Sequence, residues 1–197
     1  ISFPRQLTLG AIQDNRLVYE FGQEMARQCR RIGVNVNFAP VVDINNNVNN
    51  PVINDRSFGE DRVNVALKSS AYMDGLQDAG ILACAKHFPG HGSAQLDSHH
   101  DIVDVSDSWS PIEYAPYKQL AHQLHAVMLG HLQLDLIDDE WPASLSHKHV
   151  DWLRAHLGES TVIFSDDLQM AGVLNHLKKQ EGNTTESMTE LQAKAVC

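Results

Sequence analysis

The sequence predicts an α/β fold built on a parallel sheet. Four short apolar stretches, each able to form a strand, alternate with stretches of helical periodicity. Parallel neighbours need such crossover helices. Each expected strand is also followed by polar residues, and in a TIM-type (β/α)8 barrel the loops at the carboxyl ends of the strands form the site. An open doubly wound sheet would gather ligands only near its switch point, so we favour the barrel.

The chain is short for a complete barrel. It has 197 residues, whereas the fold typically takes about 250 and at least about 200. We therefore expect one domain over 1–197 that holds about four to five of the eight β/α units. The first residue is Ile rather than Met, so we expect the gene product to begin earlier.

The N-terminal half contains two expected helices and two expected strands. Asn15 can cap the first helix, which Gly33 ends. Alternating residues predict a strand over 34–38, followed by a long Asn-rich loop. A second helix is expected over 63–78 and an apolar strand over 81–85. The apolar residues expected to form the buried face of the first helix are Leu17, Phe21, Met25, Cys29 and Ile32.

The C-terminal half continues the alternation. Ser110 is an expected cap, and Pro111 occupies the first turn of a helix over about 111–124. Polar residues over 178–186 are expected to be exposed. The remaining expected elements are a strand over 126–129, a helix over 148–157 ended by Gly158, a strand over 161–164 and a helix over 188–196.

Composition excludes some classes of partner. The 25 acidic residues outnumber the 15 basic ones, and no basic stripe is present, so we expect no nucleic-acid partner. No run approaches the roughly 18 apolar residues of a membrane span, and the first residues do not form a signal peptide. Three widely spaced cysteines are compatible with a reducing compartment. We therefore expect a cytoplasmic protein, and the oligomeric state is not predicted.

The stretch richest in ionisable side chains follows the strand at 81–85. Residues 86–92 read KHFPGHG, and DSHH follows at 97–100. Proline cannot donate to a strand ladder, and the two glycines permit backbone angles closed to other residues. We expect this loop to have a fixed shape that holds its side chains in place.

Asp97 and His99 can act as an acid/base pair. They are two residues apart, so in an extended loop their side chains can meet. An aspartate that accepts from one imidazole nitrogen orients the ring and stabilises its protonated form, and the other nitrogen can then move a proton. Free histidine titrates near about pH 6.5, which suits both directions of transfer. His100 is expected to be solvated or structural, and His91 to make a hydrogen bond within the loop.

A carboxylate follows the last expected strand. Asp166 comes soon after the apolar residues 161–164, which would hold it rigidly at the mouth of a barrel. Neighbouring strand residues point to opposite sides, so Asp166 and Asp167 cannot both face a ligand if the strand persists. An isolated pair of this kind would more simply be exposed or cap a helix.

Basic side chains near the strand ends could donate to ligand oxygens. Lys86 ends an apolar strand, and burying an unpaired ammonium there is costly, so we expect a partner or a ligand. Arg56 could instead be a surface charge, and His87 could satisfy polar groups in the core. Asp43 is expected to hold the loop, and His131 to approach the pocket directly or through another residue.

The sequence contains six motifs in this order: VNFAPVVD at 36–43, DRSFG at 55–59, KHFPGHG at 86–92, DSH at 97–99, AVM at 126–128 with His131, and FSDDLQM at 164–170. Together they resemble glycoside hydrolase family 3, and more narrowly its NagZ-type β-N-acetylglucosaminidases of cell-wall recycling. The resemblance implies a TIM-type barrel and a retaining mechanism through a glycosyl-enzyme intermediate. The family pattern has further strands on both sides of this chain and a sugar-binding aspartate without a counterpart here.

The resemblance also implies roles for individual residues. It selects Asp166 as the nucleophile, and it gives the pair Asp97 and His99 the place of the usual acid/base carboxylic acid. The substrate would be a terminal β-linked N-acetylglucosamine on peptidoglycan-derived or related glycosides, and no cofactor is implied. The residues that would contact this sugar are Arg56, Lys86 and His87, with His131 close by.

Three alternatives stay open. A β-glucosidase or β-xylosidase of the same family would carry similar motifs. The histidines and Asp97 could bind zinc in a metal-dependent barrel hydrolase, but Pro89 and Gly90 oppose a helix that would place His87 and His91 on one face. The chain could also be an inactive fragment, because four strands cannot close an eight-stranded barrel.

Overall fold

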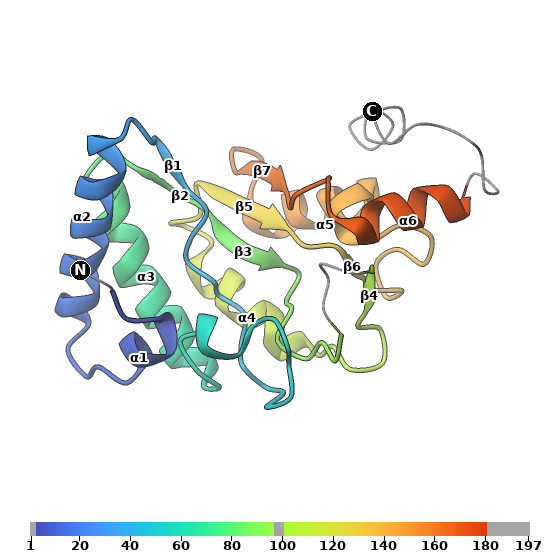
Figure 1. Cartoon of the computed structure of the whole chain (residues 1–197), viewed down its shortest axis with the longest axis horizontal. Coiled ribbons are helices and arrows are strands. Elements are labelled where there is room, and N and C mark those ends of the chain that lie inside the picture. Colours follow the sequence, from blue (N-terminus) through green and yellow to red (C-terminus); the bar gives the residue numbers. More distant parts are fainter. Residues whose placement is uncertain (1–2, 97–100, 181–197) are drawn as a thin grey trace.

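The computed structural model describes residues 3–96 and 101–180. Parallel strands run through the middle of the molecule (Figure 1). Its strands are β1 (Val36–Asn37), β2 (Leu82–Ala83), β3 (Ala85–Phe88), β5 (Ala126–Leu129) and β7 (Val162–Ser165). Strand β1 pairs with β2, and β3, β5 and β7 pair in that order. The segment that follows β1 also lies alongside β3, because Val41 forms a parallel bridge with Lys86. The strands therefore neighbour one another in chain order, as in a barrel.

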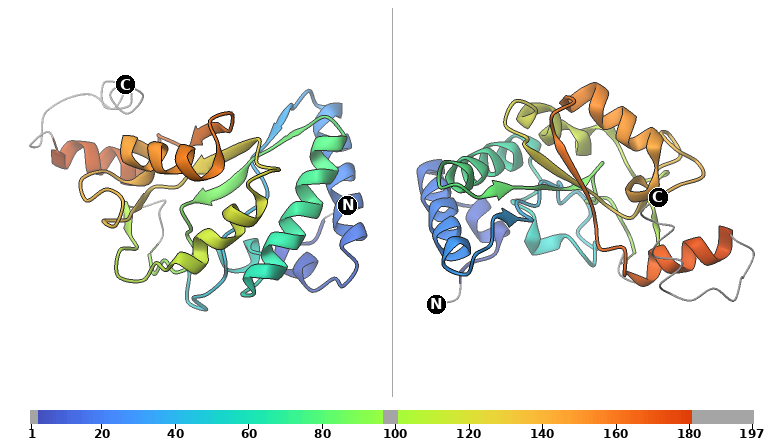
Figure 2. Two further views of the ribbon diagram at one scale, coloured as in Figure 1. Left: turned by 180° about the vertical axis from the view of Figure 1, so that it is seen from behind. Right: turned by 90° about the horizontal axis from the view of Figure 1, so that it is seen from above.

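Helices α3, α4 and α5 cover one face of this sheet, as the view from behind in Figure 2 shows. The helices are α1 (Gln6–Gly10), α2 (Asn15–Arg31), α3 (Arg62–Asp78), α4 (Pro111–Leu120), α5 (His147–Leu157) and α6 (Ala171–Gln180). Two short 3-10 helices, η1 (Asn54–Arg56) and η2 (Ala143–Leu145), lie in loops, and β4 (Val103–Asp104) pairs in parallel with β6 (Leu132–Gln133). Among the described residues, no helix is both long and apolar enough to cross a bilayer.

The two faces of the sheet carry separate apolar clusters. The larger cluster joins the sheet to the covering helices through residues such as Met73, Phe88 and Tyr117, all completely buried. The smaller one lies on the other face and includes Cys84, Met128 and Phe164. We call this second face the inner face, because it would line the inside of a closed barrel. Within the described residues, β1 and β7 each have a strand neighbour on one side only.

Helix α2 differs from its prediction in two respects. Its N-cap is Asp14 rather than Asn15, because the Asp14 carboxylate accepts the Arg16 N–H at 2.9 Å. The prediction of the buried face was also wrong in part. Leu17 and Ile32 are 46% and 79% exposed, whereas Phe21, Met25 and Cys29 are partly buried against the core. The fully buried residues are Val18, Gly22 and Ala26.

Other elements also depart from the sequence expectations. The strand predicted to stop at Ala85 resumes as β3, so Lys86 and His87 lie in a strand rather than a loop. Ser110 stands at the N-cap of α4 without a side-chain hydrogen bond, and the helix ends at Leu120. Residues 178–180 belong to α6, and the expected helix at 188–196 lies outside the described residues.

Candidate active site

A lysine and an aspartate lie near each other at the carboxyl end of the sheet. Lys86 is in β3, and Asp166 directly follows the last residue of β7. The charge of each affects the pKa of the other.

A buried carboxylate holds His87 in position. Asp43 is completely buried, and its Oδ2 lies 2.8 Å from Nδ1 of His87. The same carboxylate accepts the backbone N–H of His87 at 3.2 Å and that of His91 at 2.9 Å. Burial alone would raise the pKa of Asp43, but the interaction with His87 and these hydrogen bonds outweigh it, so the pKa is lowered. Asp43 thus holds the loop, as predicted, and fixes the His87 ring.

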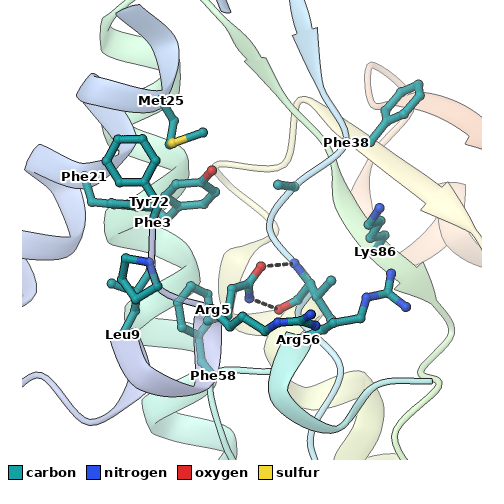
Figure 3. A pocket seen from close by; sticks show the side chains of 14 residues that line it. Phe3, Arg5, Leu9, Phe21, Met25, Phe38, Arg56, Phe58, Tyr72 and Lys86 are labelled. Atoms are coloured by element: carbon teal, nitrogen blue, oxygen red, sulfur yellow. Dashed lines mark hydrogen bonds between the residues drawn. The ribbon is translucent and has the colours of Figure 1, made fainter. Parts of the chain in front are cut away.

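Arg56 approaches the same ring from η1. Its Nη2 lies 3.4 Å from Nε2 of His87, and its Nη1 donates to the Val52 carbonyl at 3.2 Å. Burial, together with the nearby Arg56 charge, lowers the pKa of Lys86, and Asp166 opposes this. Figure 3 shows Arg56 and Lys86 on one side of a pocket, opposite the aromatic rings of Phe21 and Tyr72. This pocket has a volume of about 360 Å³, and its lining includes Phe38, Ala39 and Val41, which follow β1 in the chain.

The two aspartates after β7 have different surroundings. Asp166 is half-buried, and its Oδ1 accepts the Asp167 N–H at 2.9 Å. Burial acts to raise the pKa of Asp166, but His87, the Asp167 N–H, His131 and Lys86 together lower it. Asp167 is exposed, and its carboxylate accepts the Gln169 N–H at 2.9 Å in a turn. The ionised carboxylate facing the cations is therefore that of Asp166.

His131 lies completely buried behind these aspartates. Its Nδ1 is 2.6 Å from the Ser144 hydroxyl, and its Nε2 is 3.0 Å from the Asp167 carbonyl. Burial lowers its pKa, so the neutral ring is favoured. Both ring nitrogens have protein partners, so His131 supports the turn that carries Asp166 and Asp167. Its predicted approach to a sugar stays a prediction.

The structure brings five predicted residues to one end of the sheet. They are Arg56, Lys86, His87, His131 and Asp166. The predicted acid/base pair Asp97 and His99 lies outside the described residues, as does His100. Ser144 could not be identified from the sequence, because its role depends on His131 lying beside it in the fold. Across the part of the chain that the structure describes, no group of three His, Cys, Asp or Glu residues could hold a metal ion.

Comparison with known proteins agrees with this geometry. The N-terminal domain of glycosyl hydrolase family 3 matches residues 1–190. The chain belongs to glycoside hydrolase family 3. The domain of this family is a barrel of the (β/α)8 type, and the described part of this family 3 chain is an open portion of that barrel, as predicted.

The curated relatives of this family 3 chain are longer than the chain itself. β-Hexosaminidase LpqI of Mycobacterium tuberculosis is 40% identical over 159 residues, which are 77% of this chain and 41% of the relative. A β-hexosaminidase of Bordetella avium is 37% identical over 182 residues, which are 87% of this chain and 51% of the relative. The chain therefore spans between two fifths and about half of the length of these relatives.

Solved structures of the family superpose closely on the chain. A family 3 β-N-acetylglucosaminidase from Paenibacillus matches with a TM-score of 0.81 and 34% identity, over 97% of this chain and 40% of that one. M. tuberculosis LpqI matches with a TM-score of 0.81 and 33% identity, over 98% and 56% of the two chains.

Proposed function

We propose that this chain is part of a retaining exo-β-N-acetylglucosaminidase that removes terminal β-linked N-acetylglucosamine. The observation that carries the proposal is the ionised carboxylate of Asp166, whose pKa is lowered by His87, the Asp167 N–H, His131 and Lys86. A lowered pKa keeps this carboxylate available for attack at neutral pH. The names of the relatives, β-hexosaminidase and β-N-acetylglucosaminidase, support the choice of sugar.

The proposed reaction has two steps. Asp166 attacks the anomeric carbon, the bond to the leaving oxygen breaks, and His99 gives that oxygen its proton, with Asp97 orienting the ring. In the second step His99 takes a proton from water, the water oxygen attacks the anomeric carbon, and the bond to Asp166 breaks. The sugar leaves with its original configuration, and the carboxylate and the imidazole return to their first states.

Arg56, Lys86 and His87 form the proposed contact set for this sugar. An ionised Asp43 can only accept, so Nδ1 of His87 donates to it, and Nε2 is the atom directed at Arg56. Lys86 and Arg56 lack a carboxylate partner at hydrogen-bonding distance among the described residues, so their N–H groups can serve hydroxyl oxygens. We assign His131 to the positioning of the aspartate turn.

We propose a peptidoglycan-derived glycoside as the natural substrate and the cytoplasm as the compartment. The β-hexosaminidase relatives support the substrate, and the free thiols of Cys29 and Cys84 support a reducing compartment. Turnover of an N-acetylglucosaminide should exceed that of the matching glucoside or xyloside, and it should survive a chelator. The reverse preference would assign the chain to the other glycosidases of the family, and loss of activity with the chelator would favour a metal enzyme.

The decisive experiment compares Asp166→Ala with Asp167→Ala in the full-length protein, using an aryl N-acetyl-β-glucosaminide. We expect Asp166→Ala to lower kcat by at least about 10³-fold, and Asp167→Ala to have a much smaller effect. A fluorinated glycoside should label Asp166. A loss confined to Asp167→Ala, or a product with inverted configuration, would contradict the mechanism.

A further inference from the structure

Asn50 has every hydrogen-bonding position of its side chain occupied inside the protein. The residue is 1% exposed and lies in the long loop between β1 and η1. Its Oδ1 accepts the backbone N–H groups of Val52 at 2.9 Å and Ile53 at 2.8 Å. Its Nδ2 donates to the carbonyls of His91 at 2.8 Å and Gly92 at 2.9 Å. An amide has two donor hydrogens and two acceptor lone pairs, so this buried amide is fully paired.

The two residues on the acceptor side of Asn50 are the ones that hold Arg56. The Val52 carbonyl accepts from Nη1 of Arg56 at 3.2 Å. The Ile53 carbonyl accepts the backbone N–H of Arg56 at 2.8 Å. The amide oxygen of Asn50 therefore fixes the turn on which both the backbone and the guanidinium of Arg56 depend.

The donor side of Asn50 is joined to the loop that carries His87 and His91. The His91 N–H donates to the Asp43 carboxylate at 2.9 Å, and the same carboxylate holds the ring of His87 at 2.8 Å. The Gly90 N–H donates to the His87 carbonyl at 2.8 Å, so this loop is also closed on itself. Asn50 thus ties the turn of Arg56 to a second segment about 40 residues later in the chain, which is itself fixed.

The two tied segments meet where Arg56 approaches His87. Nη2 of Arg56 lies 3.4 Å from Nε2 of His87, which is long for a hydrogen bond. This weak contact does not determine the spacing of the two side chains, so the spacing depends on the anchors behind them. The end of the Arg56 turn has an anchor of its own, because the Ser57 hydroxyl donates to the Asp43 carbonyl at 2.6 Å. Loss of the Asn50 amide would therefore release the start of the turn and leave its end attached.

We propose that Asn50 is a positioning residue for the terminal sugar, because its amide sets the spacing between Arg56 and His87. This inference rests on the proposed function, in which Arg56 and His87 contact that sugar. Asn50 is buried, so its effect on the sugar passes through these two residues. Contacts to sugar hydroxyls are present in the bound substrate as well as in the transition state, so their loss raises KM more than it lowers kcat.

The test measures KM and kcat of the full-length protein on an aryl N-acetyl-β-glucosaminide. In Asn50→Asp the side chain keeps its shape and its acceptor oxygen but lacks the N–H donors, so only the link to residues 91 and 92 is lost. We expect KM to rise about tenfold and kcat to stay within about threefold of the wild-type value.

Asn47→Asp is the matched control. The Asn47 side chain forms a similar link from the same loop, because its Nδ2 donates to the Ala94 carbonyl at 2.9 Å and its Oδ1 accepts the Asn49 N–H at 3.0 Å. This link does not include Val52 or Ile53, which hold Arg56. We therefore expect Asn47→Asp to keep KM within about twofold of the wild-type value.

A second variant, Asn50→Ser, introduces no buried charge and has a side chain too short to make all four hydrogen bonds of the amide. It should raise KM as Asn50→Asp does, and it carries the test if the buried carboxylate of Asn50→Asp prevents folding. Combining it with Arg56→Ala shows whether Asn50 acts through Arg56. In the Arg56→Ala background we expect Asn50→Ser to change KM by less than about twofold, because the group that it positions is gone.

Other outcomes overturn the inference in distinguishable ways. A purely structural role would reduce the fraction of folded enzyme, which lowers the apparent kcat and leaves KM unchanged. That result, or the failure of both Asn50 variants to fold, would mean that Asn50 serves only the fold. Equal rises in KM for Asn50→Asp and Asn47→Asp, or additive effects of Asn50→Ser and Arg56→Ala, would also contradict the inference. Wild-type protein that does not hydrolyse the N-acetylglucosaminide refutes the proposed function itself.

Discussion

Asp43 shows how much of a site one buried side chain can organise. Its carboxylate accepts from the ring and backbone of His87 and from the backbone of His91. Replacing it with Ala would leave buried donors of His87 without their acceptor, and each loss of this kind costs about 1–3 kcal/mol. The value of Asp43 to the site lies in the orientation that it gives to the His87 ring.

His149 should make the stability of the protein depend on pH. It is completely buried in α5, neither ring nitrogen has a hydrogen-bond partner among the described residues, and burial lowers its pKa to about 4. In the unfolded chain His149 binds a proton below about pH 6.5, whereas in the folded protein it does so only near pH 4. The free energy of unfolding is therefore highest above about pH 6.5 and falls by up to about 3 kcal/mol as the pH drops to 4. Denaturant titrations at several pH values should show a smaller acid loss for His149→Leu. A variant that follows the wild-type curve would contradict this, and exposed His122 provides the control in His122→Leu.

At the scale of elements, α2 and α3 touch backbone to backbone through their glycines. A Cβ at Gly75 would lie 2.2 Å from the Tyr19 carbonyl oxygen, and a Cβ at Gly22 would lie 2.5 Å from that of Tyr72. Gly75→Ala should therefore lower the free energy of unfolding by about 1–3 kcal/mol, although alanine is the better helix former by about 1 kcal/mol. Urea denaturation measures this change. A more stable variant would show that helix propensity, and not the close approach, decides at this position.

This contact explains why α2 could be located from the sequence while its buried face was only partly predicted. Helix periodicity is a local property, so the bounds of α2, α3 and α5 could be read closely. The closest packing depends on the partner helix, which here requires small residues such as Gly22 and Ala26. Strands β4 and β6 have two residues each and no readable period, and only their mutual pairing defines them.

The same division applies to the candidate site. The resemblance to the family identified Arg56, Lys86, His87 and Asp166, and Lys86 and Asp166 were also noticeable because each follows an apolar stretch. The sequence did not show that His87 belongs to β3, because its polar ring is stabilised there by an aspartate from a distant loop. The partners of His131 also come together only in the folded chain.

At the scale of the whole molecule, the first and last strands of the sheet approach each other across the inner face. Phe38, just after β1, and Phe164 in β7 have ring centroids 5.2 Å apart in an edge-to-face arrangement, although their strands are not paired. A double-mutant cycle of Phe38→Ala and Phe164→Ala in the full-length protein should give a coupling of about 0.5–1.5 kcal/mol. Additive effects would mean that the two strands are not held together by this contact.

One pair of interstrand hydrogen bonds determines how far apart the two halves of the site lie. The Gly130 N–H donates to the Phe88 carbonyl at 2.9 Å, and the Asp166 N–H donates to the Leu129 carbonyl at 2.9 Å. Strand β5 thus lies between β3, which carries Lys86 and His87, and β7, which Asp166 follows. In deuterium oxide these two amide hydrogens should exchange slowly and lose their protection together, because a register slip in β5 would release both. In the proposed reaction, the distance between Asp166 and the residues of β3 must match the position of the anomeric carbon. Backbone hydrogen bonds set this distance, so we expect substitutions of exposed side chains around the site to leave it unchanged.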